Sequence, residues 1–529
     1  MHAKQRYDHL TSYRANFLDT AVQCSELTIP YLIRRDEYRT SYKNLRQPWQ
    51  SVGAKSVVTL AAKLMLALLP PQTTFFKLQI RDDKLGTDLP AEIRSELDLS
   101  FAKIERMVMD SIAASSDRVV VHQAIKHLVV GGNALIYMGK DGLKHYPLNR
   151  YVIERDGNGN VIEIVTKEII NKNLLPKEIV QDKLSVTEEN FASENDAEVY
   201  THVKLDNNRW LWYQEVYGKR IPGSEGKAPK DASPWLVLRF NSVDGENYGR
   251  GRVEEFLGDL KSLNALSQAL VEGSAAAAKV VFVVSPSSTT KAQTLAKAGN
   301  GAIVQGRPED IGVIQVGKTA DFGTAATMVA NLERRISEAF LVLTVRNSER
   351  TTAEEVRLTQ MELEQQLGGL FSLLTVEFLI PYLNRKLMVL QRSGELPKIP
   401  KDLVNPTIVA GINALGRGQD RESLTTFIGT IAQALGPEQM LQYINADEAI
   451  KRLAAAQGID VLNLVKSMDQ RTQERQQALA QQQQMMQMQQ LPQMLKTPFA
   501  DPTKNPNAEQ VVGDYMASQQ PQQPAPPQQ

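Results

Sequence analysis

The segment of the sequence that most closely matches a known functional motif is GVIQVGKT at 312–319. This segment fits the phosphate-binding pattern G-x-x-x-x-G-K-[ST], in which backbone N–H groups surround the phosphates of a nucleotide. Lys318 would then reach the β- and γ-phosphate oxygens, and Thr319 would hold Mg²⁺. The context disagrees, because RPEDI rather than a buried strand precedes the first glycine, and the residues VIQV favour a strand over a tight anion-binding loop. A nucleotide site is therefore the disfavoured interpretation.

The other residue types that commonly perform catalysis or bind metals show no supporting pattern. The six histidines lack the H-E-x-x-H spacing and every other metal-binding spacing. The DFG triplet at 321–323 has no accompanying H-R-D catalytic loop, and the chain has no G-x-S-x-G turn. The single cysteine, Cys24, has no base assigned to it. The sequence thus predicts no catalytic residue, no metal site and no cofactor.

Two short basic segments adjoin predicted helices. A polar loop between two long helices consists of Arg346, Asn347, Ser348, Glu349 and Arg350. Taken alone, this loop is interpreted as a solvated turn. The stretch GRGR at 249–252 is interpreted as a flexible, basic entry into a helix, because glycine allows the backbone many conformations.

Composition excludes several classes of function. The 529 residues suffice for three or four domains of roughly 150 residues each. The 60 Lys and Arg balance the 60 Asp and Glu, which argues against a protein that clamps nucleic acid tightly, but not against one that encloses DNA. The longest apolar run, at 57–69, contains Lys63 and is shorter than the about 20 residues that a membrane span needs. With one cysteine and no apolar N-terminal signal core, we expect a soluble intracellular protein in a reducing compartment.

The spacing of apolar residues predicts where the helices and strands of the chain lie. Residues 1–70 predict helices, 75–80 a strand, and 90–114 and 117–130 two further helices. From about 133 to 245 the sequence alternates in short β-type runs, with DGNGN at 156–160 as a hairpin turn.

A helical pattern returns over 252–278 and again near 324–343. Between these helices, VVFVV at 280–284 and AIVQG at 302–306 predict a small β insert. A long helix should begin at Thr352, where Glu355 completes a capping box, and should kink at Pro381. The Gln- and Pro-rich composition after about 491 predicts disorder. We therefore expect an α+β, mainly helical protein.

Several long composite segments resemble the portal, or head-to-tail connector, proteins of short-tailed, autographivirus-like bacteriophages. They follow the order of that family across most of residues 7–470. The segments are QPWQSVGAKSVVTLAAKLMLALLPPQTTFFKL (47–78), AIKHLVVGGNALIY (124–137), YGRGRVEEFLGDLKSLN (248–264), VQGRPEDIGVIQ (304–315), NSERTTAEEVR (347–357), ELEQQLGGLFSLL (362–374) and GINALGRGQD (411–420).

The resemblance implies a division of the chain into the parts of a portal subunit. These parts are an α+β wing (1–251), a first stem helix (252–278), a clip (279–320), a second stem helix (321–343), a tunnel loop (344–352), a long kinked wing helix with its connection (353–419), a helical crown (420–490) and a disordered tail (491–529). The β-containing clip would hold the phosphate-loop lookalike, which further weakens the nucleotide interpretation.

The resemblance also implies a function and a set of partners. Identical subunits, usually twelve, would surround a channel for double-stranded DNA bound without sequence specificity, with Arg346, Asn347, Glu349 and Arg350 in the channel. Lys291, Lys297 and Arg307 of the clip would contact the terminase large subunit and later the tail adaptor protein. Further implied partners are capsid, scaffolding and internal core proteins, and the implied location is the capsid of a virion assembled in the host cytoplasm. The alternative is a packaging NTPase that uses Lys318 and Thr319; a third possibility is a capsid or scaffold component without a channel.

Overall fold

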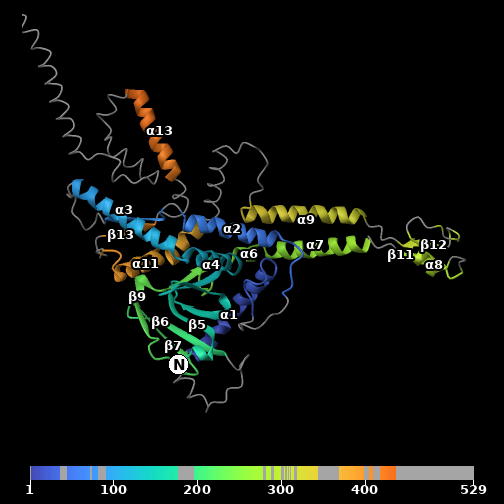
Figure 1. Ribbon diagram of the computed structural model, residues 1–529, viewed down its shortest axis with the longest axis horizontal. Helices are drawn as coiled ribbons and strands as arrows, with labels where there is room; N and C mark the ends of the chain where they lie inside the picture. The colour runs from blue at the N-terminus through green and yellow to red at the C-terminus, as the bar shows by residue number, and fades with distance from the viewer. Residues whose placement is uncertain are drawn as a thin grey trace, which may run out of the picture. The chain divides into compact units, whose positions relative to one another are not determined.

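The computed structural model describes most of the chain in two units, Met1–Arg417 and Gly418–Gln529. The described residues are 2–35, 45–71, 74–80, 91–176, 196–277, 281–287, 291–299, 303, 305, 307, 309, 311–314, 319–342, 368–397, 404–408 and 417–436. Helices and antiparallel sheets alternate along the first unit (Figure 1). The α+β class expected from the sequence is confirmed.

Four helices build the N-terminal part of the first unit: α1 (Ala3–Glu26), α2 (Val52–Leu68), α3 (Ala91–Ala114) and α4 (Asp117–Gly131). Helix α4 packs against the other three, and it buries most of its surface, including Val121, Ile125 and Val129. An apolar helix of this kind is stable only when other elements cover it on several sides. Helix α4 is therefore the centre of the main core.

Two antiparallel sheets follow. The smaller has the order β10-β2-β3, from Trp235–Arg239, Asn133–Gly139 and Gly142–Tyr146. The larger has the path β4-β5-β6-β7-β8, with β9 also paired to β7. Its strands are Tyr151–Arg155, Val161–Asn171, Asp196–Asp206, Arg209–Val216, Lys219–Arg220 and Gly226–Pro229. Short 3-10 turns lie at Leu148–Arg150, Lys172–Leu174 and Lys230–Ala232. The turn predicted at 156–160 joins β4 to β5, where the Asp156 carboxylate accepts hydrogen bonds from the backbone N–H groups of Asn158 and Asn160.

The chain then runs out along one helix and returns along another. The elements are α6 (Arg252–Glu255), α7 (Leu257–Ala277), β11 (Val281–Val284), α8 (Ala292–Lys297), β12 (Ile311–Ile314) and α9 (Thr319–Ala339). Helices α7 and α9 lie side by side and lead to the β11–β12 hairpin (Figure 1). One detail corrects the sequence analysis, because the helix expected over 252–278 is interrupted at Phe256. Strand β11 pairs with Ile311–Ile314, which overlaps the VIQV residues that the sequence favoured as a strand.

The last part of the first unit contains a helix with a π turn. Residues 368–374 are helical, η6 (Thr375–Leu379) is a π turn, and α11 spans Ile380–Ser393. Pro381 has no N–H to donate to the carbonyl of Glu377, and in the wider turn the N–H of Ile380 bonds to Thr375 instead. The expected disturbance at Pro381 thus takes the form of a π turn directly before it. Strand β13 (Val404–Ile408), which the sequence analysis missed, pairs with β1 (Phe76–Ile80). Helix α13 (Arg417–Leu435) begins the second unit.

Three glycines form a close backbone contact where α4 ends. Gly132 ends the helix with φ +74°, and a Cβ there would lie 2.5 Å from the carbonyl carbon of Arg250. A Cβ on Gly251 would lie 2.7 Å from the carbonyl oxygen of Val130. The side chain of Asn133 joins both segments, because its amide donates to Gly249 O at 2.8 Å and its oxygen accepts from Gly249 N at 2.7 Å. The flexible interpretation of 249–252 was therefore wrong.

We expect Gly132→Ala to lower the free energy of unfolding by more than about 2 kcal/mol, because the methyl group meets backbone that cannot move and φ is positive. Thermal denaturation of the purified full chain measures this loss. The matched control is Gly258→Ala, since a Cβ there meets nothing within 4 Å and alanine favours the helix by up to about 1 kcal/mol. Equal midpoints for Gly132→Ala and the wild type would contradict the close-contact account.

Candidate functional site

The α7–α9 pair presents side chains that the rest of the described chain leaves uncovered. Near the main core, Leu263 and Ile336 are buried, but none of residues 264–276 of α7 or 322–335 of α9 is. Val271 and Met328 are each about half exposed, at 52% and 51%. The helices approach closely at Gly273, where a Cβ would lie 2.6 Å from the Phe322 ring. The pair is thus held together along its length while its outer faces stay open.

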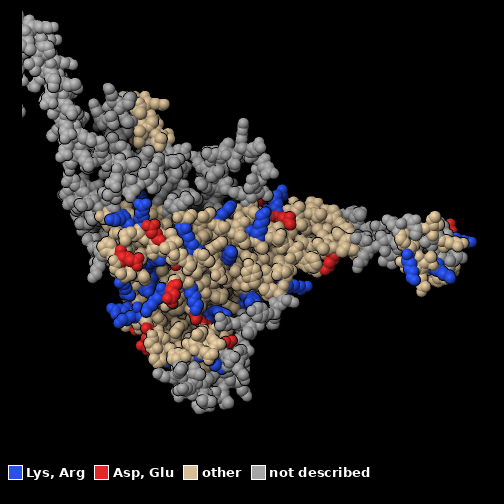
Figure 2. Space-filling model, viewed as in Figure 1, with Lys and Arg blue, Asp and Glu red and all other residues tan. Residues whose placement is uncertain are grey.

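The outer halves of α7 and α9 also carry little charge. Residues 264–277 contain one charged side chain, Glu272, and residues 319–332 also contain one, Asp321. In Figure 2 the corresponding stretch is mostly uncharged, whereas Lys, Arg, Asp and Glu are mixed over the rest of the visible described surface. A surface with this composition suits contact with another protein better than contact with water.

The three basic residues predicted for the clip lie around the β11–β12 hairpin. Lys291, Lys297 and Arg307 are all exposed. The hairpin also includes the start of the segment that matches the phosphate-binding pattern. Gly312, the first glycine of that pattern, lies in β12 opposite Val283. The residues that would have to surround a phosphate therefore begin in a paired strand. Thr319 begins α9, and Lys318 lies outside the described residues. This geometry does not match a phosphate-binding loop.

The predicted channel residues Arg346, Asn347, Glu349 and Arg350 lie outside the described residues. The structure does describe the point from which they depart, at the end of α9. Phe340 is buried there and packs its ring edge-on against Phe256 at 5.6 Å between centroids. Any role of the four residues in binding DNA stays a prediction.

The cysteine and two of the histidines, residue types that often act in catalysis, are buried inside the protein. Burial raises the pKa of the Cys24 thiol to about 12, so this thiol is not a nucleophile at neutral pH. The rings of His127 and His145 lie 4.3 Å apart, and burial lowers the pKa of both, which keeps them neutral. Among the described residues, no group of three or more His, Cys, Asp or Glu could hold a metal ion, and no helix is long and apolar enough to cross a membrane.

A buried ionic cluster that the sequence analysis missed connects the π turn to both sheets. The Glu377 carboxylate accepts from Arg239 Nε at 2.8 Å and from the Arg239 backbone N–H at 2.8 Å, and Arg155 Nη1 lies 3.5 Å away. Arg155 also donates to the carbonyls of Asn247 at 3.0 Å and Gly159 at 2.8 Å. Burial lowers the pKa of Arg155 to about 10, so this guanidinium is still charged at neutral pH. No spacing in the sequence could have indicated contacts over 138 and 222 residues.

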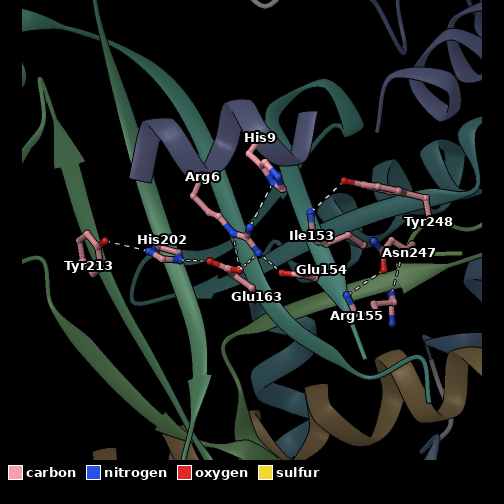
Figure 3. Close-up of polar contacts among 10 residues, drawn as sticks. All are labelled: Arg6, His9, Ile153, Glu154, Arg155, Glu163, His202, Tyr213, Asn247 and Tyr248. Carbon is pink, nitrogen blue, oxygen red and sulfur yellow. Dashed lines mark hydrogen bonds and ion pairs between the residues drawn. The ribbon is translucent and has the colours of Figure 1, made fainter. Parts of the chain in front are cut away.

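A second ionic cluster fixes α1 on the larger sheet (Figure 3). Arg6 donates from Nε to Glu163 at 2.9 Å and also pairs with Glu154. His202 Nε2 lies 2.5 Å from the other oxygen of Glu163, and His202 Nδ1 lies 3.0 Å from the Tyr213 hydroxyl. Burial acts to raise the pKa of Glu163, but the hydrogen bonds from His202 and Arg6 outweigh it and hold that pKa at about 2.

Comparison with known proteins identifies the family of this chain. Residues 1–464 match the family described as bacteriophage head to tail connecting protein. The chain is 38% identical to the portal protein of Escherichia phage T7 over 486 residues, which covers 90% of each chain. It is 38% identical to the portal protein of Enterobacteria phage T3, covering 90% of this chain and 89% of the other. The chain belongs to the bacteriophage head-to-tail connecting proteins.

Two further matches are less similar to this chain. The portal protein of Pseudomonas phage phiKMV is 30% identical over 481 residues, which cover 87% of this chain and 91% of the other. Among solved structures, the neck of an empty GTA particle matches with a TM-score of 0.39 and 14% identity, over 78% of this chain and 90% of that one. The resemblance drawn from the sequence segments is confirmed, and the named relatives are portal proteins rather than enzymes.

We expect Glu163→Gln to lower stability at pH 7 by about 1–3 kcal/mol and to flatten its dependence on acid. The pKa of Glu163 is lower in the folded chain than its ordinary value of 4.5, so the stabilisation is present above pH 4.5 and is lost as pH falls towards 2. Thermal midpoints between pH 7 and pH 3 measure both effects. Glu225→Gln is the control, because that carboxylate is exposed and lies 3.8 Å from Arg220. Parallel pH profiles for the wild type and Glu163→Gln would contradict this account.

Proposed function

We propose that this chain is the subunit of the ring-shaped portal vertex of a phage capsid and that its ring surrounds the DNA channel. The observation that carries the proposal is the match to portal proteins over 90% of the chain at 38% identity, together with the family match over residues 1–464. A portal acts in head assembly, genome packaging, genome retention and, after tail attachment, genome ejection. The virion capsid is the corresponding location, with assembly in the host cytoplasm.

The α7–α9 pair supports a ring of copies. Two helices cannot by themselves bury side chains on all sides, and the outer halves of these helices have no buried residue. In a ring, each subunit presents one surface to the copy before it and another to the copy after it. Val271 and Met328 would be covered by such neighbours, and the low charge of residues 322–332 removes the desolvation cost of covering them. We infer a homo-oligomeric ring, with twelve copies as the number that the family resemblance implies.

The channel itself would contact DNA weakly. Each phosphate that a protein neutralises releases counterions and strengthens attachment, so a heavily basic channel would hold DNA that has to slide. In a ring of subunits, the copies of Arg346 would form one circle of positive charge and the copies of Arg350 a second, with Asn347 between them in the sequence and Glu349 reducing the net charge. These circles would contact DNA phosphates whatever the base sequence, without arresting the DNA. The zero net charge of the chain agrees with this requirement.

The hairpin region is the candidate surface for partner proteins. It lies between the two helices that lead away from the main core, and it carries the exposed Lys291, Lys297 and Arg307. We propose that it docks the terminase large subunit during packaging and the tail adaptor protein afterwards. Capsid, scaffolding and internal core proteins are the remaining proposed partners, through the wing and the crown.

The alternative, a packaging NTPase that uses Lys318 and Thr319, has less support. Gly312, the first residue of the motif, is paired in a strand, and the relatives named above are portal proteins. We therefore propose a structural protein without its own nucleotide hydrolysis.

The ring is tested by electron microscopy of the purified full chain. We expect rings with a central hole, and we expect Met328→Lys to reduce them strongly, because it places a charge on a surface that another copy would cover. Leu174→Lys is the matched control, since this side chain is also exposed, at 75%, but lies in the 3-10 turn that follows β5. Circular dichroism checks that both variants fold. Particles without a hole, or nucleotide hydrolysis abolished by Lys318→Ala, would refute the proposal.

Removing two channel arginines should weaken the contact with DNA. We expect Arg346→Ala with Arg350→Ala to leave ring assembly intact, to flatten the dependence of DNA binding on salt and to reduce the retention of full-length genomes. The matched control removes two exposed lysines from the hairpin region, Lys291→Ala with Lys297→Ala. That control should keep the wild-type salt slope and lose terminase docking. An unaltered salt slope in the arginine variant would mean that these arginines do not face DNA.

A further inference from the structure

Lys63 is the cation that interrupts the longest apolar run of the sequence, and the structure gives it a specific partner. Its helix, α2, packs against α9, and Lys63 is half-buried between them. The Lys63 ammonium Nζ donates to the carbonyl oxygen of Leu341 at 2.5 Å. Burial lowers the pKa of Lys63 below its ordinary value, as expected for an amine held inside the protein. The lysine therefore contacts the residue directly after the end of α9.

The end of α9 has a strained conformation at that same residue. Leu341 N–H bonds to Glu338 O at 3.0 Å, and Val342 N–H bonds to Ser337 O at 2.8 Å. This pair of bonds closes a helix through one residue in the left-handed region, where glycine is normally found. Here that residue is Leu341, with φ +56°. A branched side chain at positive φ is unfavourable, so neighbouring contacts must hold it.

Two cations and two apolar contacts hold the end of α9. Arg252 Nη2 donates to Ala339 O at 3.2 Å, two residues before the carbonyl that Lys63 binds. Phe340 and Val342, on either side of Leu341, are 1% and 8% exposed. Positive charges are favourable at the C-terminal end of a helix, where carbonyl groups lack partners within the helix. The strained residue is thus fixed by its flanking side chains and by Lys63 at its own carbonyl.

We propose that Lys63 is a positioning residue that clamps the strained end of α9 and thereby fixes the point from which the segment beginning at residue 343 departs. The clamp rests on the geometry of residues 337–342 and does not depend on the proposed function. Its consequence does depend on that function: if residues 344–352 line a DNA channel, Lys63 sets where those residues enter it.

Amide hydrogen exchange tests the clamp in the purified full chain. Lys63→Met keeps the apolar stem and removes the donor, and we expect the amides of Leu341 and Val342 to exchange at least tenfold faster. Lys55→Met is the matched control, because Lys55 is exposed on the same helix and should leave these amides unchanged. The amide of Gly132, which bonds to Leu128 O in the main core, reports whether a variant has lost stability everywhere. Unchanged exchange at Leu341 and Val342 in Lys63→Met would overturn the proposal.

A second variant separates clamping from a general contribution to packing. Glycine adopts positive φ without strain, so in a Leu341→Gly background the end of α9 should need Lys63 less. We expect the effect of Lys63→Met on the Val342 amide to shrink at least threefold in that background. An equal effect in both backgrounds would show that Lys63 does not act through the strained residue.

Genome retention tests the consequence separately. If Lys63→Met accelerates exchange at Leu341 and Val342, heads assembled from Lys63→Met rings should lose more full-length genomes than heads from Lys55→Met rings. Accelerated exchange together with normal retention would support the clamp at the end of α9 and would contradict the assignment of residues 344–352 to a channel.

Discussion

The buried carboxylate of Glu377 is the constraint on which the arrangement of the first unit depends. It lies in the π turn before Pro381 and pairs with Arg239 of the smaller sheet and Arg155 of the larger one. A buried charge is tolerated only when opposite charges and hydrogen-bond donors surround it, and removing one member of such a pair costs about 3–5 kcal/mol. The two sheets and the helix that ends at Ser393 therefore meet at this carboxylate. The π turn belongs to this constraint, because it occurs at the residue that must reach both arginines.

Two further contacts fix helices α7 and α9 to the main core. The glycine contact at Gly132 and Gly251 brings the start of α6 against the end of α4, so that α7 departs from the centre of the core. Lys63 and Arg252 hold the carbonyls at the end of α9, where the returning helix meets the same core. Both ends of the α7–α9 pair that lie near the core are thus fixed, while its outer halves are left without buried residues. This combination suits a subunit that completes its burial by contact with other copies of itself.

Positive and negative charges are equal in number, and the ionic clusters pair them. The clusters around Glu377 and Glu163 place arginines beside carboxylates, and the outer halves of α7 and α9 contain almost no charge. A chain with zero net charge offers little general attraction for DNA, so any contact with DNA would come from a few positions repeated by symmetry. This balance of charge agrees with the proposed channel, through which DNA would have to slide.

Residue patterns were enough to predict the helices over 90–114 and 117–130, the strand at 75–80, the 156–160 turn and the α+β class, and long composite segments identified the family. These features depend on residues a few positions apart or on extended similarity, and both are visible in one dimension. The folded structure was needed to show that VVFVV pairs with Ile311–Ile314, that GRGR is a packed contact, and that Lys63, Glu377 and Leu341 have structural roles. Glu377 lies 138 positions from Arg239, and Lys63 lies 278 positions from the Leu341 carbonyl to which it donates. Buried charges and strained backbone are stable only where distant segments converge, and no local pattern of residue types encodes that convergence.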